Sequence, residues 1–173
     1  MIEITKTNLD GVLLINPPTI FEDFRGSYIE TYNKKLYKEA GIKDHFVQDD
    51  ISISRKNVLR GLHGDEKTWK LISCLYGKLF ISVVNCDMKS EHFGTWQTFT
   101  LSDSNRTQIL VPPKHANGHL VISRQAIFHY KQSTYYDGVE NQFTYRWDEP
   151  KFGIHWPIKD PILSMRDDKA PYL

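Results

Sequence analysis

The sequence predicts one all-β domain, folded as a closed or nearly closed β-sandwich or barrel. Three observations support this prediction. Short runs rich in β-branched and aromatic residues recur between turn signals, only one stretch has a clear helical pattern, and no repeat or linker divides the chain. The 173 residues suit a single domain, residues 1–173, with a full core. Folds of this kind enclose a lumen in which small ligands bind.

Strand-like runs recur between residues 71 and 147. Residues 78–84 form the clearest run, because they are mainly β-branched and aromatic. Tyr76-Gly77, which precedes this run, is predicted to be a hairpin turn that joins it to residues 71–75. The predicted strands are residues 71–75, 78–84, 96–101, 107–111, 119–123, 126–131 and 142–147.

Helical signals are confined to two places. Residues 34–40 are predicted to form a helix, with Asn33 as its N-cap and Gly41 as the residue that ends it. A second, short helical turn is predicted near the C-terminus, after Trp156-Pro157.

Composition and charge exclude several classes of protein. Hydrophobic residues make up 40% of the chain and charged residues 25%, which is typical of an ordinary globular protein. The formal net charge of +1 provides no basic field, so nucleic acid is not an expected partner. The apolar run at residues 11–15 is too short for a signal-peptide core or a membrane span, so no membrane association is expected.

The chain contains two cysteines, Cys74 and Cys86. Both lie in apolar, strand-like runs, where a buried thiol is the expected state. We therefore expect a reduced protein located in the cytoplasm.

His63 is the first candidate for chemistry. It lies between Gly61 and Gly64, which leave room for a ligand or another backbone to approach. Simple alternation predicts that Arg60 and Leu62 share one side of a strand, and that Gly61 and His63 share the other. An imidazole is the side chain best matched to proton abstraction near neutral pH, although a structural histidine is the more common case.

A catalytic metal is not expected. Small β-barrels often bind a metal through a His-x-His pair, and this chain has no such pair. His63, Asp65 and Glu66 could imitate part of a metal site, and His115 with His119 could supply more of it. His115 and His119 lie four residues apart in a stretch predicted as turn and strand, so they need not face the same way.

Several segments, taken together and in order, resemble the dTDP-4-dehydrorhamnose 3,5-epimerase family. The most specific match is Val58-Leu59-Arg60-Gly61-Leu62-His63. The other matching segments are residues 24–30, 46–54, 93–96, 111–113, 130–136, 154–157 and 163–167. The resemblance covers nearly the whole chain, and the run of matches is a far stronger signal than any single segment.

The resemblance implies a cupin-like jelly-roll barrel with a few short helices. It implies a homodimer in which N-terminal strands cross to the partner, and an enzyme that needs neither a metal nor a cofactor. Its substrate would be a nucleotide-diphosphate sugar. The implied reaction is epimerisation of carbon 3, carbon 5 or both in a 4-keto-6-deoxy sugar through an enolate, in the synthesis of surface polysaccharide or capsule.

Four residues match the family's proton-transfer positions. The resemblance implies that His63 is the general base and that Asp167 is the carboxylate paired with it. Tyr130 matches the tyrosine that protonates the opposite face of the sugar, and Lys70 matches a lysine that faces the enolate oxygen. These roles agree with the physical chemistry, since a ketone acidifies the neighbouring carbons and a protonated phenol can donate near neutral pH.

Further residues match binding positions of the family. Those implied to hold the nucleotide and diphosphate are Arg25, Glu30, Gln48 and Arg60, and Tyr136 is implied to help seat the sugar. Other positions depart from the family pattern. Asn117 stands where a histidine usually lines the active site, and His115 and His119 replace aromatic residues.

The departures leave the substrate open. Gly64-Asp65 replace an aromatic residue and a glutamine after the base histidine. The stretch at residues 63–70, together with Asn117, is similar to a subgroup that acts on GDP-4-keto-6-deoxy-heptoses. A 3,4-ketoisomerase, a non-catalytic sugar-binding module and a metal-dependent oxygenase are the alternative interpretations.

Overall fold

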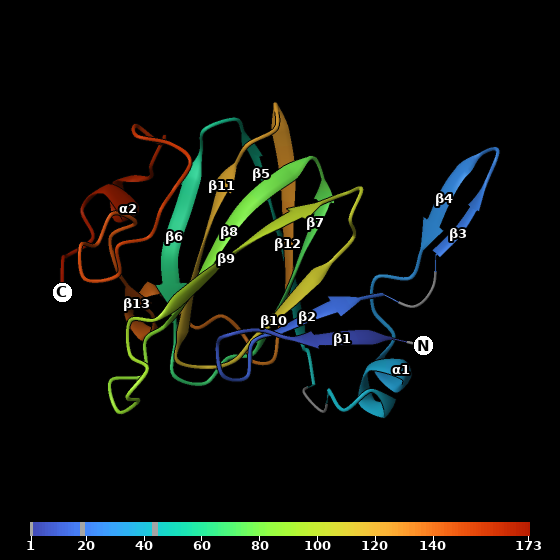
Figure 1. Ribbon diagram of the computed structural model, residues 1–173, viewed down its shortest axis with the longest axis horizontal. Helices are drawn as coiled ribbons and strands as arrows, with labels where there is room; N and C mark the ends of the chain where they lie inside the picture. Colours follow the sequence, from blue (N-terminus) through green and yellow to red (C-terminus); the bar gives the residue numbers. More distant parts are fainter. Residues whose placement is uncertain (1, 18–19, 43–44) are drawn as a thin grey trace.

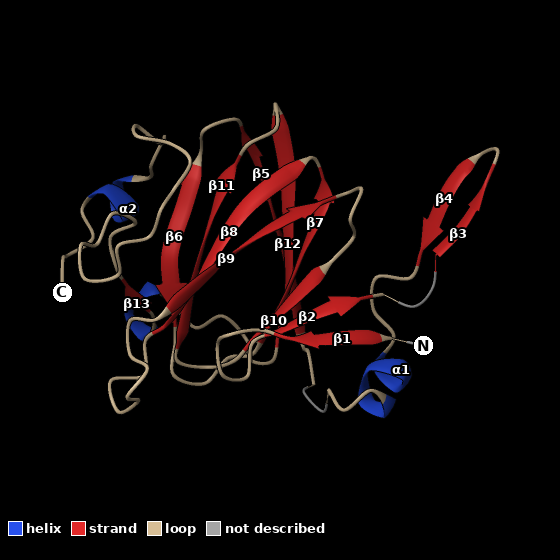
Figure 2. Ribbon diagram, in the orientation of Figure 1, coloured by secondary structure: helices blue, strands red, loops and turns tan. Residues whose placement is uncertain are grey.

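The computed structural model describes residues 2–17, 20–42 and 45–173, and strands dominate it (Figure 2). Two antiparallel sheets pack together, and a separate hairpin projects from the body (Figure 1). One sheet has the order β1-β2-β10-β7-β12-β5 and the other the order β13-β6-β11-β8-β9. The architecture confirms the predicted all-β, cupin-like class with a few short helices.

The first sheet has six strands, and its members come from distant parts of the chain. They are β1 (Glu3–Lys6), β2 (Leu13–Asn16), β10 (Gln108–Val111), β7 (Lys70–Tyr76), β12 (Gln125–Gln132) and β5 (Gln48–Arg55). The second sheet has five strands. They are β13 (Phe143–Thr144), β6 (Leu59–Gly64), β11 (His115–Val121), β8 (Lys78–Asn85) and β9 (Trp96–Ser102).

The remaining elements lie outside the two sheets. They are the hairpin strands β3 (Ile20–Asp23) and β4 (Gly26–Ile29), the helices α1 (Lys34–Glu39) and α2 (Met165–Asp168), and the short 3-10 helix η1 (Val139–Asn141). In Figure 1 the hairpin stands well away from the sheets, and α2 lies at the opposite end beside β6. No helix in the described part of the chain is long and apolar enough to cross a membrane.

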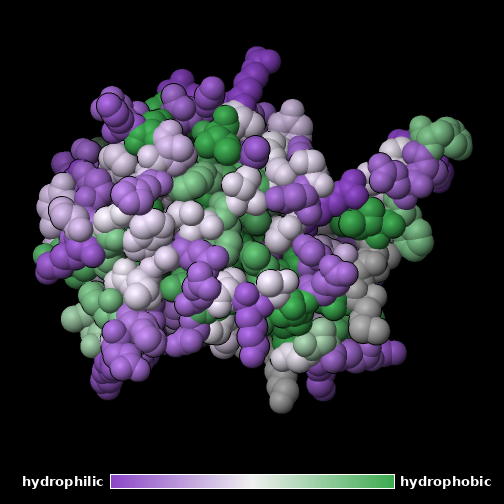
Figure 3. Space-filling model, viewed as in Figure 1, coloured by the Kyte–Doolittle hydropathy of each residue, from purple (hydrophilic) through white to green (hydrophobic). Residues whose placement is uncertain are grey.

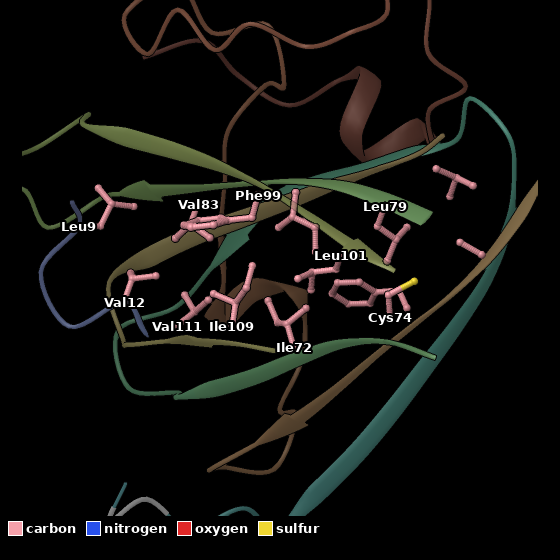
Figure 4. Close-up of a cluster of buried hydrophobic side chains, with 14 residues drawn as sticks. Leu9, Val12, Ile72, Cys74, Leu79, Val83, Phe99, Leu101, Ile109 and Val111 are labelled. Atoms are coloured by element: carbon pink, nitrogen blue, oxygen red, sulfur yellow. The ribbon is translucent and has the colours of Figure 1, made fainter. Parts of the chain in front are cut away.

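The main hydrophobic core lies between the two sheets (Figure 4). Ile72 and Ile109 reach it from the six-stranded sheet, and Leu79 and Val83 reach it from the five-stranded sheet. All four side chains are fully buried. Burial of alternate residues from both sheets is what joins the two layers, because each strand turns every second side chain inward.

The predicted hairpin at Tyr76-Gly77 is wrong. Strands β7 and β8 flank this dipeptide but belong to different sheets, so the chain crosses between the layers there. Gly77 has a φ of +77°, and a Cβ on it would lie 2.1 Å from the carbonyl oxygen of Gln125. Both flanking runs are apolar. An apolar run does not show whether the next strand pairs with it in the same sheet or continues in the other sheet, so the pattern could not exclude the crossing.

Other strand boundaries also differ from the prediction. Strand β11 begins at His115 rather than at residue 119, so His115 and His119 share one strand. The predicted strand at residues 142–147 is reduced to β13, the edge strand of the five-stranded sheet, which pairs with β6. Strands β1 to β5 are not among the strands predicted from the residue pattern, and β1 to β4 have short, mixed sequences that lack a clear period.

The helix predictions are largely confirmed. Helix α1 is capped by Asn33, whose side chain accepts hydrogen bonds from the backbone N–H groups of Lys35 and Leu36. Gly41 follows the helix with a φ of +96°, as a helix-ending glycine should. The predicted C-terminal helical turn corresponds to α2, which is capped by Ser164.

Both cysteines are buried and free, as predicted. Burial raises the pKa of the Cys74 thiol to about 11 and that of the Cys86 thiol to about 12. Neither thiol is therefore activated near neutral pH.

Candidate active site

A β-bulge in β6 decides which side chains face the interior. Asn117 of β11 pairs with His63 of β6, but His119, two residues further, pairs with Arg60, three residues back. The extra residue on β6 breaks the alternation and turns Arg60 and His63 toward the same cavity. The prediction that Arg60 and His63 lie on opposite sides of a regular strand is therefore wrong.

The glycines around His63 are needed for close packing against protein. A Cβ on Gly61 would lie 2.5 Å from the Cα atom of Gly118, and Gly61 has a φ of +117°. A Cβ on Gly64 would lie 2.4 Å from the Phe143 ring. Of the two expected uses of these glycines, the structure supports approach by other parts of the chain.

His63 is paired with a buried carboxylate. Its Nε2 atom lies 2.6 Å from Oδ1 of Asp167, and the Asp167 side chain is 2% exposed. The cap of α2 positions this carboxylate, because Ser164 Oγ accepts a hydrogen bond from the Asp167 backbone N–H at 3.1 Å. Burial alone would raise the pKa of Asp167, but the hydrogen bond and charge of His63, with bonds from Ser164 and Gly61, lower it overall. Asp167 is therefore an anion that can fix and stabilise the imidazole.

The pair faces a cavity of about 330 Å³ between the two sheets. The lining residues come from β5, β6, β7, β11 and β12 and from the C-terminal segments. They are Ser52, Arg60, His63, Lys70, Asn117, His119, Phe128, Tyr130, Tyr136, Gln142, Ser164, Arg166 and Asp167. The cavity thus brings together the four residues predicted for proton transfer.

Tyr130 and Lys70 enter the cavity from the six-stranded sheet. Tyr130 of β12 pairs with Ile72 of β7, and Lys70 lies two residues before Ile72, so both side chains point inward. His63 enters from the other sheet, which places the imidazole and the phenol on different walls. Burial raises the pKa of Tyr130 to about 12, with a smaller contribution from Asp50, so its phenol is protonated near neutral pH.

Lys70 is a buried lysine in the cavity wall. The pKa of its side chain is lowered from 10.5, mainly by burial. The charge of Asp65 opposes this decrease, and the charge of Arg166 adds to it. The turn before it is fixed by Asp65 Oδ1, which accepts from the backbone N–H groups of Lys67 at 3.0 Å and Thr68 at 2.7 Å. These hydrogen bonds hold the turn that leads into Lys70.

The loop before Lys70 is tied to the loop that carries Tyr136. Thr68 Oγ1 lies 2.7 Å from Thr134 Oγ1, and Lys67 Nζ donates to Asp137 at 2.7 Å. These contacts hold the two loops together at the side of the cavity where Lys70 and Tyr136 lie.

The predicted binding residues divide into two groups. Arg60, Asn117 and Tyr136 line the cavity. Gln48 is not among the lining residues but contacts one of them, since its Oε1 accepts a hydrogen bond from the Tyr136 backbone N–H at 2.9 Å. The second group, Arg25 and Glu30, belongs to the β3–β4 hairpin and the residue that follows it.

Arg25 and Glu30 are not part of the cavity lining in this chain. Arg25 lies at the tip of the β3–β4 hairpin, where its guanidinium is 77% exposed and pairs with Asp23 at 2.6 Å. Glu30 directly follows β4 and is half-buried. Their contact with the nucleotide stays a prediction.

Sequence reasoning assigned no binding role to six of the lining residues. They are Ser52, His119, Phe128, Gln142, Ser164 and Arg166. Strand alternation from Asn117 would have indicated His119, and proximity to Asp167 would have indicated Ser164 and Arg166. Gln142 lies beside the short strand β13 and carries no such signal.

The arrangement suits proton transfer at carbon. It supplies an imidazole with a carboxylate behind it, a protonated phenol on another wall and a buried lysine side chain. Among the described residues, no group of three or more His, Cys, Asp or Glu side chains is arranged to hold a metal ion. His115 and His119 lie on the same strand, but only His119 lines the cavity.

Comparison with known proteins gives consistent matches along the whole chain. The family model described as dTDP-4-dehydrorhamnose 3,5-epimerase matches residues 6–173. The chain is 38% identical to the dTDP-4-dehydrorhamnose 3,5-epimerase of Salmonella typhimurium, over 100% of this chain and 96% of that protein.

Solved structures agree with the sequence matches. The chain is similar to a dTDP-6-deoxy-D-glucose-3,5-epimerase of Legionella pneumophila in complex with dTDP-4-keto-L-rhamnose, with a TM-score of 0.93 and 37% identity over 99% of this chain and 93% of that chain. It is also similar to a dTDP-4-dehydrorhamnose 3,5-epimerase of Bacillus anthracis with TDP and pyrophosphate bound. There the TM-score is 0.93 and the identity 32%, over 100% of both chains.

Proposed function

The chain belongs to the dTDP-4-dehydrorhamnose 3,5-epimerase family, and on this premise we propose that it inverts carbon 3, carbon 5 or both in a nucleotide-linked 4-keto-6-deoxy sugar. It is an isomerase of the 3,5-epimerase type. The reaction proceeds by removal of a proton beside the ketone and its replacement on the opposite face.

His63 removes the proton. Because its Nε2 is bound to Asp167, its Nδ1 is the nitrogen that accepts a proton from the sugar carbon. The C–H electron pair forms a double bond to carbon 4, and the carbonyl electrons move onto the ketone oxygen. The Asp167 carboxylate stabilises the imidazolium that forms, as a carboxylate does behind the histidine of a catalytic triad.

Tyr130 and Lys70 complete the reaction. Lys70 stabilises the negative oxygen of the enolate, and one well-placed donor contributes roughly 3–4 kcal/mol in comparable sites. Tyr130, protonated near neutral pH, donates its proton to the other face of the carbon. The donor and the base act from different walls, so the centre is inverted.

The observation that carries this proposal is the 2.6 Å His63–Asp167 contact at a cavity that Tyr130 and Lys70 also line. The test is incubation with dTDP-4-keto-6-deoxyglucose in deuterated water, followed by NMR. Deuterium should enter carbon 3, carbon 5 or both with the wild-type protein, and should not enter with His63→Asn. Absence of exchange in the wild type with dTDP- and GDP-linked keto sugars would reject the proposal.

The polar cavity wall favours a second substrate for the same reaction. Asn117 and His119 place amide and imidazole groups in the lining, which suits a sugar with additional hydroxyl groups, such as a GDP-linked 4-keto heptose. Turnover of the dTDP-hexose and the GDP-heptose measured side by side decides between them. Either product would supply the synthesis of surface polysaccharide or capsule.

The protein acts as a homodimer in this proposal, with the β3–β4 hairpin packed on the partner. Phe21 is 66% exposed, Phe24 99% and Tyr28 71%, and Figure 3 shows hydrophobic residues uncovered on this projecting arm. An isolated two-stranded hairpin is marginally stable in water, and exposed apolar groups of this size favour burial against another surface. A second copy would bury them and bring Arg25 to the partner's cavity.

A further inference from the structure

We propose that His119 is a specificity-determining residue that binds a hydroxyl group of the substrate sugar. The inference rests on the proposed function and deepens it, because it requires a sugar that presents a hydroxyl to His119 in the cavity. Sequence reasoning considered His119 only as a metal ligand and as a replacement for an aromatic residue.

The orientation of His119 is fixed. Its ring stacks on Phe128, with the ring centroids 4.0 Å apart and the planes at 10°. His119 comes from the five-stranded sheet and Phe128 from the six-stranded sheet, so the stack joins the two layers across the interior. The residue is 4% exposed, and it lines the cavity together with Phe128.

The wall around His119 has polar atoms that the protein itself does not satisfy. His119 Nε2, Asn117 Oδ1 and Ser52 Oγ are all buried and have no hydrogen-bond partner among the described residues. All three residues line the same cavity. Buried polar atoms without a partner are rare and costly in native proteins, and a group of them at a cavity indicates a polar ligand.

His119 is suited to a hydroxyl rather than to an ion or a proton transfer. Burial, with smaller contributions from the charges of Arg60 and His63, lowers the pKa of His119 to about 3. The ring is therefore neutral near neutral pH, with one nitrogen that donates and one that accepts. A hydroxyl also donates and accepts, whereas so weak a base would contribute little to removing a proton from carbon.

The proposal can be tested by binding alone, with sugars that cannot react. Calorimetry would measure the affinity of wild type and His119→Phe for dTDP-glucose and its 2-deoxy, 3-deoxy and 6-deoxy analogues. Phenylalanine keeps the stack on Phe128 but removes both nitrogens. We expect one deoxy analogue to bind wild type about two- to tenfold more weakly than dTDP-glucose, the usual effect of one neutral hydrogen bond.

That loss should disappear in His119→Phe, while losses for the other analogues persist. Coupling between one hydroxyl and one side chain, measured in this way, separates recognition from a general disturbance of the cavity. His119→Gln, which keeps polar atoms at the position, should restore part of the discrimination. Dichroism spectra would verify that each variant is folded.

A second readout follows the histidine directly. With ¹⁵N-labelled histidine, the His119 nitrogen signals should shift on binding of dTDP-glucose but not on binding of dTDP, which lacks the sugar. If each deoxy analogue lost the same affinity in His119→Phe as in wild type, the proposed role of His119 would be overturned, and the proposed function would stand. If neither dTDP-glucose nor GDP-mannose bound the wild type, the proposed function would fail as well.

Discussion

The Nε2 atom of His63 lies 2.6 Å from Oδ1 of Asp167, although the two residues are 104 positions apart in the chain. The bulge in β6 turns the imidazole into the cavity, and the N-cap of α2 brings the carboxylate behind it. This contact leaves Nδ1 as the nitrogen that can receive a proton. The proposed chemistry depends on that tautomer.

Asp167→Asn should lower kcat by roughly 10²- to 10⁴-fold, as loss of the equivalent carboxylate does in a catalytic triad. The amide can hold the wrong tautomer and cannot stabilise the imidazolium. The measurement is turnover of the keto sugar by NMR. Asp168→Asn is the matched control, because Asp168 is the adjacent exposed carboxylate and should tolerate the change. Near wild-type turnover in Asp167→Asn would refute this role.

The pH profile of kcat/KM should fall on its alkaline side because of Lys70. Burial lowers the pKa of this ammonium group below 10.5. As the pH rises through that lowered value, the group loses the charge that stabilises the enolate, so the rate decreases. Lys70→Arg should be slower but should lack this decrease, since a guanidinium keeps its charge.

Tyr130→Phe serves as the control for that pH profile. The pKa of Tyr130 is raised to about 12, so the phenol does not titrate over the same range. The alkaline decrease should therefore remain in Tyr130→Phe. An unchanged decrease in Lys70→Arg would show that another group is responsible.

Gly61→Ala should destabilise the fold. The new Cβ would lie 2.5 Å from the Cα of Gly118, at a φ of +117°, and backbone cannot move aside cheaply. We expect a loss of roughly 2–4 kcal/mol in the free energy of unfolding, measured with urea. Gly153→Ala is the control: its φ is also positive, at +63°, but its nearest atom is 3.8 Å away, so about 1 kcal/mol is expected. Equal losses would contradict the close-approach argument.

Mixed dimers should reveal whether Arg25 acts on the partner's site. Arg25→Ala and His63→Asn should each be impaired alone. If the hairpin crosses over, a heterodimer of the two contains one site with both wild-type groups, His63 from one subunit and Arg25 from the other. Activity should therefore reappear on mixing after co-refolding. No recovery, with dimers verified by light scattering, would place Arg25 at its own subunit's cavity or at none.

The fold class could be predicted from the sequence because strand and helix patterns are local. The β-branched run that became β8 and the capped helix α1 show this, since each carries its own signal. Pairing between distant strands is not encoded locally. The crossing at Gly77 was taken for a hairpin for that reason. The first half of β11 was missed because Asn117, like His119, faces a polar cavity rather than the core.

The candidate site was predicted mainly through the family resemblance. No periodicity could place Asp167 beside His63, because the contact joins a bulged strand to a capped helix near the other end of the chain. The bulge itself reversed the predicted facing of Arg60. His119 was assigned to turn and strand, and only the correct strand boundary shows that it lines the cavity with Asn117.

The most direct test of two-sided proton transfer is Tyr130→Phe in deuterated water, with Tyr76→Phe as the control at an exposed position outside the cavity. NMR would follow deuterium incorporation and inversion at carbons 3 and 5 of the keto sugar. We predict that Tyr130→Phe still exchanges the proton that His63 reaches but forms inverted product far more slowly than Tyr76→Phe. Inversion at the wild-type rate in Tyr130→Phe would contradict the account.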